Sequence, residues 1–257
     1  MTDSGLSGRR LIMHAAHKTI GVSAAPAALR SWEPFGFSTA DDLSGPLRVC
    51  LVCAAATRGA EESLAALERD LADRCEVECS RLRGPSAGEL ADLAGLETSD
   101  CMLLLWRQTA LEGGRLQRIR DYCRLGGAIV GVRSAGCALQ DWLSFDKEVF
   151  GADYLGHHAN RPTEVRIVEA VGDHPILLGV EPFTSEGSLQ KSRHLAEDAT
   201  VLLWGKFAGY GEPVAWTRTY HGGRVFYTSL GHPEDFGQPA FLRLLANALR
   251  WTANRPR

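Results

Sequence analysis

A histidine and a carboxylate lie two residues apart directly behind an apolar run near the C-terminus. In the stretch RVFYTSLGHPEDF, the run at residues 225–230 ends at Gly231, and His232 and Glu234 follow. An apolar run that ends at turn residues predicts a buried strand in a sheet covered on both faces. Ligands of such sheets bind just past the carboxyl ends of the strands. We therefore predict that His232 is a general acid or base oriented by Glu234, and a solvated turn is the alternative.

A second pair of reactive residue types, Cys50 and Cys53, shows the C-x-x-C spacing of zinc and redox sites. The pair lies inside an apolar run, LRVCLVC, which predicts a strand whose successive side chains point to opposite faces. Positions three residues apart in a strand face opposite ways, so the two thiols would not share a site. We predict that the seven cysteines are reduced core residues of a cytoplasmic protein.

The composition is ordinary for a globular chain and argues against several classes of function. Hydrophobic residues make up 45% of the 257 residues and charged residues 23%, which is enough for a large core. The formal net charge of −3 gives no excess of positive charge with which to bind nucleic acid. No run reaches the roughly 18 apolar residues that a membrane helix needs. We therefore predict a protein with no nucleic-acid partner and no membrane association.

The predicted strands and helices that would position the candidate reactive residues begin at Leu47. Residues 1–46 show no clean periodicity and are predicted to be an extension that is partly disordered, and residues 47–257 form one domain. Within the first half of this domain, strands alternate with helices of 3.6-residue periodicity. The predicted strands are residues 48–53, 76–82, 101–106 and 128–132, and the predicted helices are residues 61–71, 87–96 and 111–125. This alternation predicts a parallel sheet with right-handed crossovers.

The second half of the domain has short strands with little helix between them. Apolar or alternating segments occur at residues 163–168, 200–204, 213–217 and 225–228, separated by Gly, Pro and charged residues. This pattern predicts an antiparallel extension of the sheet and then a return to the main layer. Residues 239–251 predict an amphipathic helix that closes the chain. Its apolar surface would support a homo-oligomer.

Several segments resemble one family in their order along the chain. They are GGAIVGVRSAG, YLGHH, DHPIL, SEGSL, ATVLLWG, PVAWTR and RVFYTSLGHPEDF. Residues 47–253 are similar to the ThuA-like (trehalose utilisation) family, which has the flavodoxin-like fold of the class I glutamine amidotransferases. The resemblance implies an α/β, three-layer fold with a mostly parallel sheet, helices on both faces and an antiparallel extension in the second half.

The resemblance also locates the elbow where class I glutamine amidotransferases carry their nucleophilic cysteine. This chain keeps the H-P-E of residues 232–234 but has Arg133 at the elbow. Arginine cannot replace a thiolate, so we expect no glutaminase activity. A guanidinium can instead hold a carboxylate, a phosphate or vicinal hydroxyls, and Ser134 follows it directly. We predict that Arg133 and Ser134 bind substrate, and an arginine paired with Glu234 or Asp235 in an empty site is the alternative.

Two further segments enter the candidate site through the same resemblance. The family's glycine–histidine corresponds to Gly156-His157 in YLGHH, and its acidic position corresponds to Glu186, although the tyrosine of the family segment is missing here. His157 and Glu186 are therefore predicted substrate-binding residues. His157, His158 and His232 are weaker candidates for a zinc-like divalent metal, because imidazole suits such ions. No H-E-x-x-H spacing is present, so we predict that no cofactor is required.

The remaining histidines and the tryptophans have ordinary structural explanations. We expect His174 to cap or pack a turn, and His194 and His221 to be solvated. Four tryptophans could stack on a sugar face, although most end apolar strands and are expected in the core. They are Trp106, Trp142, Trp204 and Trp216.

Two functions follow from these observations. The first is an enzyme of carbohydrate metabolism that acts on a sugar or keto-sugar of the trehalose-related disaccharide class, as the resemblance implies. It would be a keto-sugar isomerase, lyase or hydrolase that uses His232 for proton transfer. The second is a non-catalytic sugar-binding or assembly module on an amidotransferase scaffold that has lost its nucleophile.

Overall fold

The computed structural model describes residues 45–54, 59–74, 76–84, 93–105, 113–133, 135 and 142–254 of the chain. All structural statements below concern these residues. The predicted extension at residues 1–46 lies outside them except for its last two positions. Ser134, a predicted substrate-binding residue, and Trp106 also lie outside the described residues.

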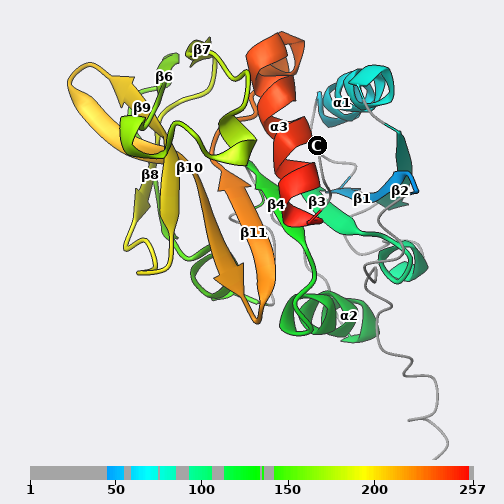
Figure 1. The fold of residues 1–257 in the computed structure, drawn as a ribbon. Helices are drawn as coiled ribbons and strands as arrows, with labels where there is room; N and C mark the ends of the chain where they lie inside the picture. The colour runs from blue at the N-terminus through cyan, green and yellow to red at the C-terminus, as the bar shows by residue number, and fades with distance from the viewer. Residues whose placement is uncertain are drawn as a thin grey trace, which may run out of the picture. The chain divides into compact units, whose positions relative to one another are not determined.

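Five parallel strands form one part of a sheet that has nine strands in the described chain (Figure 1). They are β1 (Leu47–Ala54), β2 (Val77–Gly84), β3 (Cys101–Leu105), β4 (Ile129–Val132) and β11 (Gly223–Thr228). Their spatial order is β2-β1-β3-β4-β11, and each neighbouring pair is parallel. This is the strand order of flavodoxin-like folds, so the predicted fold class is confirmed.

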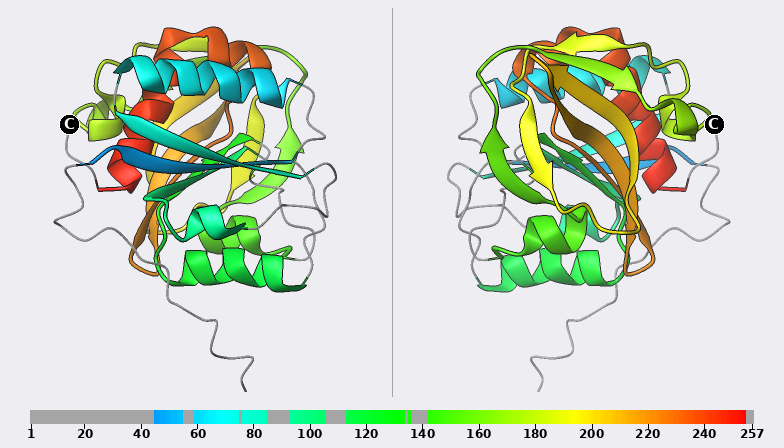
Figure 2. Two further views of the ribbon diagram at one scale, coloured as in Figure 1. Left: turned by 90° about the vertical axis from the view of Figure 1, so that its right-hand side faces the viewer. Right: turned by 90° about the vertical axis from the view of Figure 1, so that its left-hand side faces the viewer.

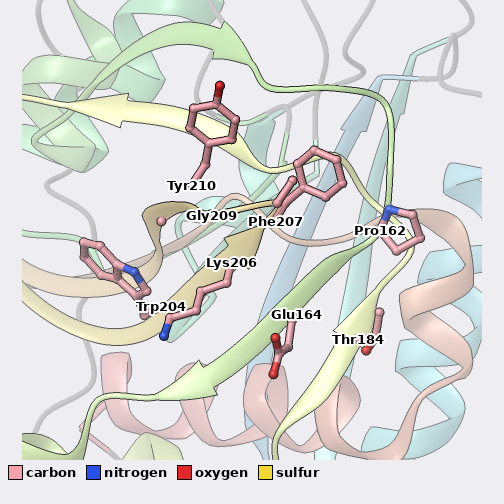
Figure 3. Close-up of a pocket in the computed structure, with 10 residues that line it drawn as sticks. Pro162, Glu164, Thr184, Trp204, Lys206, Phe207, Gly209 and Tyr210 are labelled. Carbon is pink, nitrogen blue, oxygen red and sulfur yellow. The ribbon is translucent and has the colours of Figure 1, made fainter.

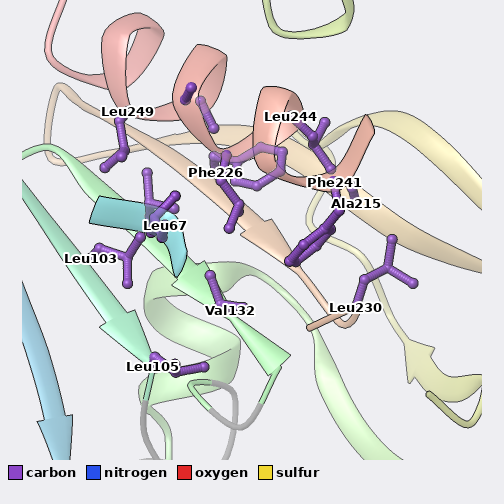
Figure 4. Packing of buried hydrophobic residues seen from close by; sticks show 14 of the residues in the cluster. Leu67, Leu103, Leu105, Val132, Ala215, Phe226, Leu230, Phe241, Leu244 and Leu249 are labelled. Carbon is purple, nitrogen blue, oxygen red and sulfur yellow. The ribbon is translucent and has the colours of Figure 1, made fainter. Parts of the chain in front are cut away.

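Helices cover both faces of this parallel part because its central strands are apolar throughout. All residues of β3 and β4 are buried. The helices α1 (Ala60–Arg74) and α3 (Pro239–Thr252) pack on one face (Figure 2). Helix α2 (Gly113–Arg124) and the π-helical segment η5 (Asp146–Phe150) pack on the other. Figure 4 shows the core between the sheet and helices α1 and α3, in which Phe241 and Leu244 of α3 pack near Phe226 of β11.

The predicted antiparallel extension is present and is longer than expected. It consists of β10 (Tyr210–Tyr220), β9 (Thr200–Phe207), β6 (Thr163–Ile167) and β7 (Phe183–Ser185). All neighbours from β11 to β7 pair antiparallel. Because Ala215 pairs with Thr228, the last residue of β11, residues 210–214 of β10 run past the carboxyl end of the parallel strands. The hairpin of β9 and β10 therefore rises beside the edge where the predicted site lies.

Two predictions of local structure need correction. No strand was predicted over the segment YLGHH or over residues 190–193, but β5 (Asp153–His157) pairs with β8 (Gln190–Arg193) in a separate sheet of two strands. Neither strand is an apolar run, because this sheet leaves most of β5 exposed or half-buried. The predicted helix at residues 87–96 is described only over its end, where η3 (Leu93–Leu96) is a short 3₁₀ turn.

Three cysteines of the described strands, Cys50, Cys53 and Cys101, are buried core residues as predicted, whereas Cys79 of β2 is half-buried. Cys50 belongs to the core on one face of the sheet and Cys53 to the core on the other. Burial raises the pKa of both Cys50 and Cys101 to about 12, so these thiols stay protonated and unreactive at neutral pH. The described helices are all too short or too polar to cross a membrane. The cytoplasmic location stays a prediction.

Candidate functional site

The turn that follows β11 brings the predicted histidine to the end of β4. Gly231 has a φ of +116°, which a residue with a side chain rarely adopts. A Cβ added to Gly231 would lie 2.6 Å from Cγ1 of Val132 and 3.5 Å from Cβ of Arg133. Glycine therefore lets the turn approach β4 closely, and the backbone next to His232 lies against the predicted elbow residue.

Asp235 is the buried charge that holds this turn. Its side chain is 0% exposed, and it lies in the short 3₁₀ segment η8 (Pro233–Gly237). One carboxylate oxygen accepts hydrogen bonds from the N–H groups of Gly231 and His232, each at 2.9 Å. The same oxygen accepts a hydrogen bond from Oγ of Ser185 at 2.7 Å, and the other accepts one from the N–H of Glu186 at 3.1 Å. Asp235 therefore joins the His232 turn to a segment about 50 residues earlier in the chain.

His232 itself carries the most unusual polar atom of this turn. The side chain is half-buried, and Nδ1 is fully buried without a hydrogen-bond partner among the described residues. Buried polar atoms are nearly always paired, so an unpaired one marks a place where a functional partner is expected. An imidazole nitrogen in that position can accept a proton from a ligand or donate one to it.

Arg133 directly follows β4 and has a left-handed backbone conformation. Its φ is +48°, an uncommon value for a residue with a side chain and one that recurs at functional sites. Oη of Tyr227 donates a hydrogen bond to the carbonyl oxygen of Arg133 at 2.9 Å, which fixes the backbone of the elbow. The guanidinium packs so closely on Gly187 that a Cβ there would clash with it. Because Ser185 and Gly187 belong to the segment held by Asp235, one network positions both Arg133 and His232.

The structure does not bring the predicted carboxylates to His232. Glu234 is exposed and makes no hydrogen bond to His232 in the described structure. The side chain of Glu186 is also exposed, and it is its backbone N–H that binds Asp235. The role of Asp235 as the carboxylate that holds the turn was not predicted from the sequence. An available signal was its position three residues after the residue that starts the turn, where a carboxylate accepts from the first N–H.

The two adjacent histidines of YLGHH have different environments. His157 is exposed, and Oη of Tyr154 lies 3.5 Å from its Nδ1. His158, the weaker candidate in the sequence, has a side chain that is only 9% exposed, and its Nε2 lies 3.0 Å from Oε1 of Glu212. Glu212 is 1% exposed and also accepts a hydrogen bond from Arg193 at 2.9 Å. His158 therefore attaches the small sheet of β5 and β8 to β10.

The candidate metal ligands are not gathered in one place. Within the described ranges, no group of three or more His, Cys, Asp or Glu side chains has the arrangement of a metal site. Nε2 of His158 is already directed at Glu212. Metal content therefore stays a prediction to be measured.

The other predicted histidines lie as expected. Nδ1 of His174 accepts a hydrogen bond from the N–H of Ile176 at 3.2 Å and so caps η7 (Pro175–Leu177), and its ring packs on Trp251. His194 and His221 are exposed in turns.

Fold and site together define an α/β protein of the flavodoxin-like type with a candidate ligand site at the carboxyl edge of its parallel strands. The chain matches the model of the ThuA (trehalose utilisation) family over residues 51–252, and it belongs to that family. No curated protein matches the chain.

Solved structures show the same fold at low sequence identity. A ThuA-like protein from Parabacteroides merdae is 16% identical, with a TM-score of 0.64 over 81% of this chain and 90% of its own. A ThuA-like protein from Bacteroides uniformis, also 16% identical, has a TM-score of 0.62 over 81% of this chain and 92% of its own. A cytoplasmic protein from Salmonella typhimurium is 13% identical, with a TM-score of 0.60 over 80% of this chain and 99% of its own.

Proposed function

We propose that this ThuA-like protein acts on a sugar or keto-sugar of the trehalose-related disaccharide class, with His232 as the acid–base residue and without glutaminase activity. The observation that carries the proposal is the buried, unpaired Nδ1 of His232 on a turn that lies against Arg133. The substrate class comes from the family name, trehalose utilisation.

The chemistry that His232 and Arg133 together support is proton transfer next to a carbonyl group. His232 removes a proton from the carbon beside the ketone, and negative charge develops on the ketone oxygen. The guanidinium of Arg133 donates hydrogen bonds to that oxygen and stabilises the charge. In an isomerisation, the hydroxyl on the deprotonated carbon passes its proton to the former ketone oxygen and becomes the new carbonyl, while His232 returns its proton to the former ketone carbon. In an elimination, the ketone re-forms, a carbon–carbon double bond forms, and His232 gives its proton to the hydroxyl on the next carbon, which leaves as water. A positioned histidine typically contributes about 10²- to 10⁴-fold in rate to such steps.

Among the described residues, the site offers no cysteine nucleophile for glutamine hydrolysis. The elbow residue is Arg133, and the thiols of Cys50 and Cys101 are buried with a raised pKa. We expect no ammonia release from glutamine by the purified protein. Measurable release that depends on a cysteine would contradict the proposal.

A turnover screen with sugars and keto-sugars tests the enzyme assignment. We expect saturable turnover by the wild type and a kcat about 10²- to 10⁴-fold lower in His232→Gln, because the variant cannot transfer the proton. Arg133→Lys keeps the charge but loses the fork of donors, so we expect a smaller loss. His221→Asn is the matched control, since His221 is exposed in the turn between β10 and β11, at the opposite edge of the sheet.

The same screen distinguishes an enzyme from the second candidate function, a non-catalytic sugar-binding module. If no sugar or keto-sugar is turned over while a sugar binds saturably, and if Arg133→Ala abolishes that binding, the protein is a binding module. Turnover that survives in both His232→Gln and Arg133→Ala would show that another part of the molecule carries the activity.

A further inference from the structure

An open face of the antiparallel extension gathers an aromatic ring with charged and hydroxyl side chains. The sheet register places Trp204 opposite Arg166, and Lys206 opposite Glu164. Glu164 in turn lies opposite Thr184 of the edge strand β7. Paired positions share one face of a sheet, and all five side chains are exposed. Figure 3 shows four of these side chains, all but Arg166, around a groove of about 660 Å³.

Trp204 is more exposed than the two other described tryptophans that were expected in the core. Its side chain is 37% exposed, whereas Trp142 and Trp216 are 5% and 1% exposed. A Cβ added to Gly211 would lie 2.5 Å from Nε1 and 3.2 Å from Cε2 of Trp204. The indole therefore packs directly on the bare backbone of the neighbouring strand. A ring supported in this way is a preformed platform for a flat apolar ligand surface.

The hairpin that carries the platform closes in a turn of two residues, because Phe207 at the end of β9 pairs with Tyr210 at the start of β10. Ala208 and Gly209 have φ values of +46° and +84°, as in the tight two-residue turns that match the twist of paired strands. Tyr210, at the rim of the groove, stacks on His158 with ring centroids 4.3 Å apart. Since His158 is held by Glu212, the rim is fixed before any ligand arrives.

The charges of the groove favour a neutral ligand with many hydroxyl groups. Arg166 is paired with Glu164 at 2.8 Å, whereas the ammonium of Lys206 forms no ion pair with any described residue. Lys206 offers donors, Glu164 offers acceptor oxygens, and Thr184 offers both. One unpaired cation beside a carboxylate is a poor site for phosphate, which requires a concentration of basic groups.

We propose that this face binds a neutral oligosaccharide, with the C–H face of a pyranose ring stacked on Trp204 and its hydroxyls bound by Lys206, Glu164 and Thr184. The groove volume falls in the range of small-ligand sites. None of these residues belongs to the candidate site at His232. The proposal is therefore independent of the proposed function.

Calorimetric titration of the full chain with trehalose, maltose and cellobiose tests this site. We expect saturable binding of at least one disaccharide and a loss of about tenfold or more in affinity in Trp204→Ala. Gly211→Ala adds a methyl group beneath the ring and should displace it, with a similar loss. Trp204→Phe should retain part of the affinity, and Lys206→Ala, a surface change, should weaken binding without affecting the thermal midpoint.

The variants distinguish this groove from the site at His232. Binding that His232→Gln abolishes and Trp204→Ala leaves unchanged would overturn the proposal, as would a wild type that binds none of the three sugars. Self-association of the wild type that Trp204→Ala prevents, measured by analytical ultracentrifugation, would make this face an interface between two copies and would also overturn it. Loss of turnover in His232→Gln has no bearing on either result.

Discussion

Asp235 is fully buried, and its carboxylate accepts hydrogen bonds from four donors in two segments of the chain. Hydrogen bonds to an ionised acceptor are stronger than those between neutral groups, and a buried donor that loses its partner is costly. One side chain therefore fixes the turn of His232 and the segment around Gly187, on which Arg133 packs.

Replacing this carboxylate should weaken the whole network. Asp235→Asn places an amide NH₂ where donors converge, and we expect the free energy of unfolding to fall by about 3 kcal/mol. Urea unfolding measures the change. Glu234→Gln, one residue away and exposed, is the matched control and should stay within about 0.5 kcal/mol of the wild type. Equal losses in the two variants would contradict the role of Asp235.

His174 gives a pH dependence that can be assigned to one group. Burial, and secondarily the charge of Arg224, lowers the pKa of His174 below 6.5. As the pH falls below about 6.5, the unfolded chain takes up this proton before the folded protein does. The stability that neutral His174 contributes is therefore complete above that pH, and it is lost as the pH falls through the lower folded value.

The expected result is a steeper loss of thermal stability for the wild type than for His174→Asn between pH 7 and pH 5. Asparagine can cap η7 without titrating in this range. Thermal unfolding at several pH values measures the difference. Parallel curves for the two proteins would show that His174 has no such role.

At the scale of elements, the turn between β11 and η8 depends on close approach to β4. Gly231→Ala would force a Cβ to within 2.6 Å of Val132 at a φ of +116°. We expect it to lower the free energy of unfolding by about 2–4 kcal/mol. Gly222 also has a positive φ, +84°, but a Cβ there would meet nothing within 4 Å.

Gly222→Ala therefore isolates the cost of backbone conformation, which is about 1 kcal/mol. Urea unfolding of both variants measures the steric part as the difference between them. If Gly231→Ala is no more destabilising than Gly222→Ala, the turn does not need the close contact with β4.

At the scale of the whole molecule, the candidate metal ligands belong to separate units of structure. His157 ends an exposed strand of the small sheet, His158 is directed at Glu212, and His232 lies on the turn after β11. We expect chelation with EDTA to leave the thermal midpoint unchanged. Near-stoichiometric divalent metal in the purified protein, lost in His157→Ala or His232→Ala, would contradict this expectation.

The parallel half of the fold could be read from the sequence because each element carries its own pattern. Runs such as residues 101–105 are apolar throughout because helices cover both faces of the sheet. The same rule of alternation separated Cys50 from Cys53, and the turn after the last parallel strand indicated where His232 would lie. These features depend on neighbours within a few residues.

The remaining features of the site depend on contacts between segments that lie far apart in the sequence. Asp235 is buried and Glu234 is not, because Asp235 binds Ser185, which lies 50 residues away in the sequence. His158 is the less exposed of the two adjacent histidines because it meets Glu212, which lies 54 residues away. Trp204 ends an apolar run and was expected in the core. It is exposed because its neighbour across the pair with β6 is Arg166, which is itself exposed, and its neighbour in β10 is the bare backbone of Gly211. No local pattern carries such information, since it arises only when the chain folds and segments far apart in sequence meet.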